Sequence, residues 1–143
     1  MEQVKINYLA VIVSTVVFFL LGWLWYGILF TSLWMQYTGI TMDQAPSGAE
    51  IAMQMGGSVV AYFIMFYCLV HVNHAFQVKD VKGAIQSGFW TWLGFIATVL
   101  FVNNLYQGKP IGLWLIDAGY WLLGLLAGAI ILVKMKKNEA AAQ

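Results

Sequence analysis

The chain has 143 residues, of which 62% are hydrophobic and 9% are charged, and its mean hydropathy is +0.78. A single small core cannot bury that many apolar side chains, so the composition excludes an ordinary soluble domain. The net charge of +1 and the lack of arginine disfavour a nucleic-acid partner, because phosphate backbones are bound by basic patches.

Four stretches with at most one formally charged residue are long enough to cross a bilayer core of about 30 Å, which needs roughly 20 helical residues. They are residues 7–30, 51–72, 83–104 and 111–133. The expected fold is therefore an all-α integral membrane protein, a single domain in which four transmembrane helices form a bundle. No internal duplication is evident along the chain.

Lysine placement sets the expected orientation of the bundle. With four crossings, both termini share one side of the membrane with the loop between the second and third spans. That side holds six of the seven lysines, and the other side holds only Lys109. Because lysine-rich segments stay in the cytoplasm, the N- and C-termini are predicted to be cytoplasmic.

Two local patterns mark the connections. Ser47 and Glu50 form a capping-box pattern, which predicts that the second span begins near Gly48. The longest connection, residues 31–46, contains TSLWMQYTGI, which we expect to form a short helix in the membrane interface.

Small and polar residues mark the packing faces of membrane helices better than hydrophobicity does. In the fourth span, Asp117 and Trp121 fall on one helical stripe with a GxxxG element, so the carboxylate shares its face with closely packing residues. The glycines predicted to lie at helix-packing positions are Gly22, Gly57, Gly94, Gly124 and Gly128.

An ionisable group inside a membrane span is costly, so Asp117 is the leading candidate for a functional residue. Counting helix depth places several polar and aromatic residues at its level, which predicts an outward-facing pocket for a ligand or a proton. The predicted members are Asp117, Trp121, Trp25, Tyr26, Gln54, Ser58, Thr98 and Asn104. The alternative is that Asp117 is structural and is hydrogen-bonded to nearby Trp, Tyr, Ser or Thr groups.

Metal and catalytic chemistry have little support in the sequence. His71 and His74 are three residues apart, but only Asp80 accompanies them, so they are weak metal candidates and no metal is expected. The chain has no Ser-His-Asp spacing, no HExxH and no paired carboxylates at a catalytic separation. No cofactor is therefore expected, and an enzyme is the least supported class.

Five short elements carry a resemblance to a known family. They are NYLA at residues 7–10, the adjacent Trp25 and Tyr26, WLGF at 92–95, NNLYQG at 103–108 and IDAGY at 116–120. In these elements the chain resembles the bacterial four-helix membrane family known as domain of unknown function 1761. The resemblance implies a four-span fold in the bacterial inner membrane and singles out Asp117, but it implies no activity.

Two functions remain open at this point. One is a binding or transport-related module in the lipid bilayer whose pocket around Asp117 holds a small amphiphile or lipid. The other is a structural or accessory subunit that packs against itself, as a homo-oligomer, or against a partner membrane protein through its Gly-lined faces. An open cavity beside Asp117 would favour the first, and a close-packed bundle with an exposed Gly and aromatic patch would favour the second.

Overall fold

Every regular element in the described part of the chain is helical, as the sequence predicts. The computed structural model describes residues 4–141, with side chains described through residue 136. In chain order the elements are α1 (Tyr8–Leu24), a π-helical turn η1 (Trp25–Leu29), α2 (Thr31–Thr38), a 3-10 turn η2 (Met42–Gln44), α3 (Gly48–Ala75), α4 (Val81–Thr91), a second π-helical turn η3 (Trp92–Ala97), α5 (Thr98–Tyr106) and α6 (Ile111–Ala141).

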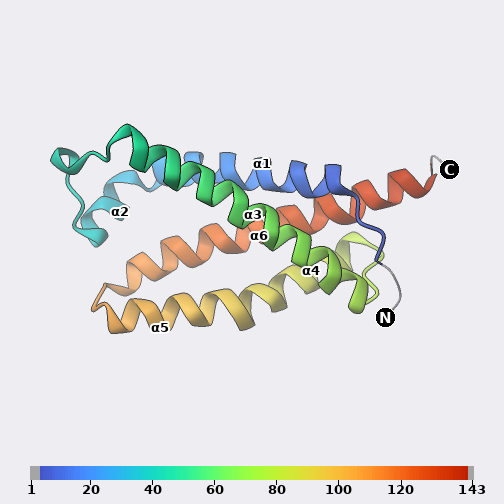
Figure 1. The fold of residues 1–143 in the computed structure, drawn as a ribbon. Helices are drawn as coiled ribbons and strands as arrows, with labels where there is room; N and C mark the ends of the chain where they lie inside the picture. The colour runs from blue at the N-terminus through green and yellow to red at the C-terminus, as the bar shows by residue number, and fades with distance from the viewer. Residues whose placement is uncertain (1–3, 142–143) are drawn as a thin grey trace.

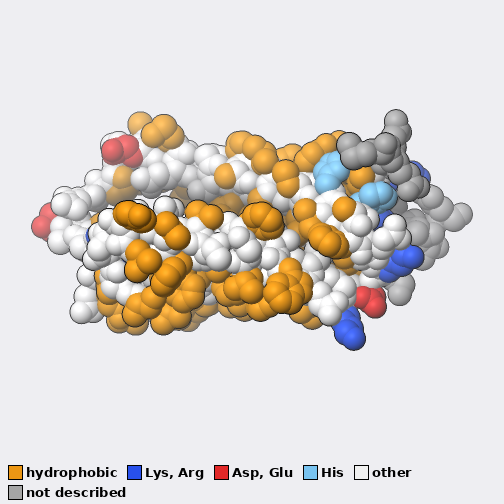
Figure 2. All heavy atoms as spheres, turned by 90° about the horizontal axis from the view of Figure 1, so that it is seen from below, with side chains coloured by type: hydrophobic (Ala, Val, Ile, Leu, Met, Phe, Trp, Pro, Cys, Tyr) orange, Lys and Arg blue, Asp and Glu red, His pale blue; other side chains and the backbone are white. Residues whose placement is uncertain are grey.

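Four continuous helices are long and apolar enough to cross a membrane, and the most apolar stretches within them have mean hydropathies from 1.5 to 2.2. Exposed hydrophobic side chains spread along the body of the molecule in Figure 2, whereas lysine and histidine gather toward one end. A surface of this kind is suited to lipid and indicates a membrane protein. The four helices are Tyr8–Leu29, Gly48–Ala75, Val81–Tyr106 and Ile111–Lys136.

The central helix of the bundle is α6, which packs mainly against α1 and α4 (Figure 1). Half of its most apolar stretch is buried, compared with 11% for α3. Both termini and the α3–α4 loop lie at one end, which we call the lysine-rich end (residues 4–7, 76–80 and 134–136). The segment α2 and the α5–α6 turn lie at the opposite end.

Two glycines of α6 let the helices approach closely. A Cβ atom on Gly124 would lie 1.9 Å from Cε2 of Phe18, and one on Gly128 would lie 2.0 Å from Cε1 of Phe66. Both phenylalanines are fully buried, and their rings meet edge to face with centroids 5.9 Å apart. The GxxxG element therefore leaves room on α6 for one ring from α1 and one from α3.

The helix α3 packs against the bundle only over its second half. Its start is the predicted one, because Ser47 and Glu50 each accept a hydrogen bond from the backbone N–H of the other, which confirms the capping box. Residues 48–57 are all exposed, and the three buried side chains of the helix come later. Those side chains are Phe66, Leu69 and Asn73.

The predicted short helix in the long connection is also present, as α2. It lies against the start of α6, where a Cβ atom on Gly112 would be 2.6 Å from the Tyr37 ring. The Lys109 ammonium donates to the Thr38 carbonyl at 2.9 Å, and this bond ties the end of α2 to the α5–α6 turn. The helix α2 is therefore part of the folded bundle, whereas residues 39–46 of the connection are exposed.

Candidate functional site

The carboxylate of Asp117 is bonded to a tyrosine from the first membrane-length helix. The hydroxyl of Tyr26 donates to Oδ1 of Asp117 at 2.7 Å, across 91 residues of sequence. Both side chains are partly buried, so the bond is shielded from bulk water without being sealed in the core. A tyrosine hydroxyl is one of the donors expected if Asp117 has a structural role.

Two indole groups hold the backbone of α6 on either side of this carboxylate. Nε1 of Trp25 donates to the Ile116 carbonyl at 3.0 Å, and Nε1 of Trp92 donates to the Ala118 carbonyl at 2.8 Å. A buried indole N–H needs an acceptor, and these two find theirs on the residues that flank Asp117. The aspartate therefore sits between two fixed points, one from η1 and one from η3.

The two indole contacts come from a repeated motif. The segments WLWYG (residues 23–27) and WTWLG (residues 90–94) share the pattern WxWxG, and in each the second tryptophan begins a π-helical turn. The first tryptophan is exposed in both, at 65% for Trp23 and 66% for Trp90. In both spans it is the second tryptophan of the pattern that donates to a carbonyl of α6. Such π-turns often mark functional positions.

An aromatic cluster continues from Tyr26 toward the core. The Tyr120 hydroxyl lies 3.1 Å from the Phe18 carbonyl, to which it donates, and 3.3 Å from the Tyr62 hydroxyl. Its ring stacks on the Phe18 ring with centroids 4.6 Å apart. A Cβ atom on Gly22 would lie 2.8 Å from the Tyr120 hydroxyl, so glycine is needed there for this approach.

A groove opens between α1 and the exposed half of α3, with a volume of about 460 Å³. It brings together four residues singled out from the sequence. They are the pocket candidates Tyr26, Gln54 and Ser58 and the packing candidate Gly22. Asp117 does not line the groove itself and reaches it through the Tyr26 hydroxyl. The lining residues are Phe19, Leu20, Gly22, Trp23, Tyr26, Gln54, Met55, Ser58, Tyr62 and Tyr120.

Three other predicted pocket residues lie elsewhere. Thr98 is exposed and donates to the Gly94 carbonyl on its own helix. Asn104 is buried and donates to the carbonyls of residues 109 and 110, so it shapes the α5–α6 turn. Trp121 packs edge to face on Phe18 with ring centroids 5.1 Å apart. None of the three lines the groove. The hydrogen bonds of Thr98 and Asn104 are local, whereas Trp121 packs between helices, behind the groove residue Tyr62.

The five glycines predicted to lie at helix-packing positions fall into two groups, those that contact another helix of the chain and those that do not. Gly22, Gly124 and Gly128 each face an aromatic ring at close range. Gly57 and Gly94 have no atom within 4 Å of the position of an added Cβ, so any helix packing at these two would involve a neighbour outside the chain. For Gly57 and Gly94, helix packing stays a prediction.

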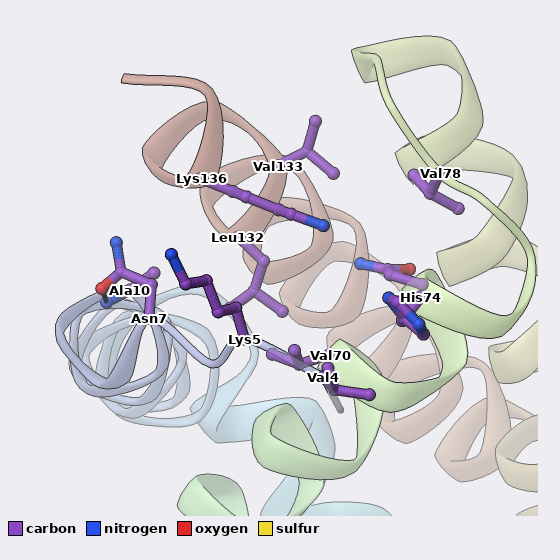
Figure 3. A pocket seen from close by; sticks show the side chains of 11 residues that line it. Val4, Lys5, Asn7, Ala10, Val70, His74, Val78, Leu132, Val133 and Lys136 are labelled. Atoms are coloured by element: carbon purple, nitrogen blue, oxygen red, sulfur yellow. Dashed lines mark hydrogen bonds between the residues drawn. The ribbon is translucent and has the colours of Figure 1, made fainter. Parts of the chain in front are cut away.

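The histidines lie near the lysine-rich end. The His71 ring is 5.1 Å from the Tyr67 ring, and His74 lines a cavity of about 140 Å³ (Figure 3). Within residues 4–136, no group of three or more His, Cys, Asp or Glu side chains is placed to hold a metal ion. Lysines near both termini were a sequence signal for that cavity, but only the fold brings them to one place.

The comparisons with known proteins address the family of the chain. The model of the family described as "Protein of unknown function (DUF1761)" matches residues 9–133, which is most of the chain. No curated protein and no solved structure matches the chain. The matched region includes both WxWxG segments, Asp117 and the α6 glycines. It therefore contains Asp117 together with the two tryptophans that bond to α6 on either side of it. The chain therefore belongs to the DUF1761 family.

Proposed function

We propose that this protein binds a small amphiphile or lipid in the groove between α1 and α3. The observation that carries the proposal is the lining of that groove, in which apolar walls surround a few polar groups. Binding sites for small molecules commonly combine a mostly apolar surface with a small number of placed hydroxyls and amides. A ligand with an apolar body and a polar end matches that combination.

The polar groups of the groove come from three helices. Tyr26 comes from the first membrane-length helix and Tyr120 from α6. The other polar groups, Tyr62, Gln54 and Ser58, lie on α3. The Ser58 hydroxyl donates to the Gln54 carbonyl on its own helix, which leaves the Gln54 side-chain amide as the freer polar group on this helix. We assign the polar end of the ligand to the region between this amide and Tyr26.

In this proposal Asp117 is a positioning residue. Its bond to Tyr26 directs the tyrosine hydrogen toward α6, so the hydroxyl oxygen is left to accept a bond from a ligand in the groove. The same pair has the groups that a proton relay would need, with the tyrosine hydroxyl between the carboxylate and the groove. The two indole bonds keep this part of α6 in register.

The location in the cell is part of the proposal. We place the protein in the bacterial inner membrane with the lysine-rich end in the cytoplasm, because lysines favour that side. The groove is lined by the end of α1 and the start of α3, so it would open in the outer half of the bilayer. A ligand could then enter sideways from the lipid.

Site-specific cross-linking tests the groove. A photoreactive amino acid replaces Ser58 in one variant and Val60 in a matched control, which is 60% exposed and does not line the groove. After irradiation in cells, mass spectrometry identifies the molecules attached to each purified variant. We expect a defined amphiphile or lipid enriched at position 58. The same bulk phospholipids at both positions would refute the proposal.

The exposed half of α3 favours a second candidate, an accessory subunit that docks on other helices. Gly56 and Gly57 lie side by side in this half with open space around them. Small residues on an exposed membrane helix let a neighbouring helix approach closely. Native mass spectrometry from detergent separates the candidates. A monomer that retains a small ligand supports the groove, whereas a homo-oligomer or a hetero-complex without one supports docking.

A further inference from the structure

A second cavity lies at the lysine-rich end, far along the bundle from the aromatic groove. It has a volume of about 140 Å³ and is enclosed by the segment before α1, the end of α3, the α3–α4 loop and α6 (Figure 3). The cavity volume is on the order of ten times that of one water-sized sphere. A tetrahedral oxyanion therefore fits inside. The polar side chains that line it include Lys5, Asn73, His74 and Lys136.

The buried amide of Asn73 is incompletely bonded. This side chain is only 7% exposed, and its Oδ1 accepts a hydrogen bond from Ser87 at 2.5 Å. Its Nδ2 is buried and has no hydrogen-bond partner among the described residues. Buried polar groups nearly always have a partner, so an unpaired donor at a cavity wall points to an acceptor that binds there.

The other polar groups around this amide have the same preference. Lys5 and Lys136 both line the cavity, from opposite ends of the chain. Figure 3 shows the Lys136 side chain reaching from α6 toward the side of His74, whereas the Lys5 side chain lies at the far rim beside Asn7. The described lining contains no Asp or Glu. Carbonyl oxygens in the last turn of α3, which would repel an anion, already accept bonds from the N–H groups of residues 76–78.

We infer that this cavity binds a phosphate-type oxyanion, carried either by an anionic lipid headgroup or by free phosphate. Lysine ammonium groups and an amide N–H are suited to phosphate oxygens, and basic pockets between membrane helices recognise headgroups in this way. The site is separate from the proposed groove and does not depend on it, because the two cavities share no lining residue.

The test measures binding of two probes to the full chain. In neutral detergent the protein is titrated with inorganic phosphate in one arm and with phosphatidylglycerol in the other, with phosphatidylcholine as the reference lipid. Dissociation constants come from thermal-shift titrations. Three variants are compared with the native chain: Lys136→Gln, Asn73→Asp and, as the matched control on the same helix, Lys134→Gln, whose exposed side chain does not line the cavity.

The two cavity variants weaken binding for different reasons. Lys136→Gln removes one positive charge and is expected to raise the dissociation constant about fivefold. Asn73→Asp keeps the oxygen that accepts from Ser87 but faces the ligand with a negative charge, so we expect more than about a tenfold loss. Lys134→Gln should change the constant by less than about twofold, because it alters only the general surface charge.

The pattern across probes decides the source of the oxyanion. Saturable binding of phosphatidylglycerol alone supports a headgroup site, binding of inorganic phosphate alone supports a free-anion site, and binding of both supports a site that reads only the phosphate group. The inference is overturned if neither probe saturates, if Asn73→Asp binds as tightly as the native chain, or if Lys134→Gln weakens binding as much as Lys136→Gln does.

Discussion

Replacing Gly124 by alanine tests whether the GxxxG element of α6 acts as the packing surface for Phe18. The added methyl group would lie 1.9 Å and 2.0 Å from two carbons of that ring, far inside van der Waals contact. The ring cannot move aside easily, because it is fully buried and stacked on Tyr120 with centroids 4.6 Å apart. Either α1 and α6 must separate or the ring must leave its position.

The size of the effect follows from two opposing contributions. Overpacking a filled core costs roughly 1–3 kcal/mol, and the upper end applies where the neighbour is held on several sides. Alanine favours the helix over glycine by about 1 kcal/mol. We therefore expect Gly124→Ala to lower the free energy of unfolding by about 2 kcal/mol.

The assay is reversible unfolding in mixed micelles with increasing SDS, followed by tryptophan fluorescence. Gly57→Ala is the matched control, because that glycine is also inside a membrane-length helix but has open space around it. It should be neutral or stabilising by up to about 1 kcal/mol. The difference between the two variants isolates the contact with Phe18 from helix propensity.

A second-site variant makes the prediction sharper. Phe18→Leu removes the ring atoms that the new methyl group would meet, so in a double-mutant cycle the two changes should couple favourably by more than about 1 kcal/mol. Equal stability of Gly124→Ala and Gly57→Ala would refute the packing argument, and so would strict additivity with Phe18→Leu.

The remaining predictions use the same unfolding assay unless stated. Trp92→Phe removes an indole bond to α6 and should cost about 1 kcal/mol, whereas Trp90→Phe, at an exposed position, should change little; equal losses would show that the bond contributes nothing. Tyr26→Phe takes the hydroxyl donor from Asp117 and should cost roughly 1–3 kcal/mol. Adding Asp117→Asn should recover part of this loss because no charge is then left without its donor, and a double variant less stable than Tyr26→Phe would contradict this account. Ser47→Ala should weaken the start of α3 by about 1 kcal/mol, seen as faster amide hydrogen exchange there; unchanged exchange would exclude a role for the capping box.

The sequence by itself determined the class of fold and several local features. Apolar runs of membrane-crossing length, with at most one formally charged residue each, mark the four long helices, since length and hydropathy are properties of each segment alone. The capping box at Ser47 was equally readable, because its two hydrogen bonds join residues three positions apart. The repeated WxWxG pattern was also present in the sequence, and aligning the first span with the third would have found it.

Only the tertiary structure decided which residues meet. Counting helix depth grouped Tyr26, Thr98 and Asn104 with Asp117. In the fold only Tyr26 donates to the carboxylate, whereas the side chains of Thr98 and Asn104 make local hydrogen bonds. Glycines that look alike in sequence also differ, since Gly124 lies directly against the Phe18 ring and Gly57 faces open space. Hydropathy cannot separate such cases, because in a membrane the lipid-facing and buried sides of a helix are both apolar.

The lysine-rich cavity shows the same limit most clearly. Its walls come from residues 4–10, 70–78 and 132–136, three segments that have no relation along the chain. Charge counting predicted that these lysines share one side of a membrane. It did not predict that two of them line a cavity with Asn73, whose Nδ2 has no hydrogen-bond partner in the described part of the chain. The rotation of each helix about its axis decides this, and that rotation is set by how side chains from neighbouring helices fit together.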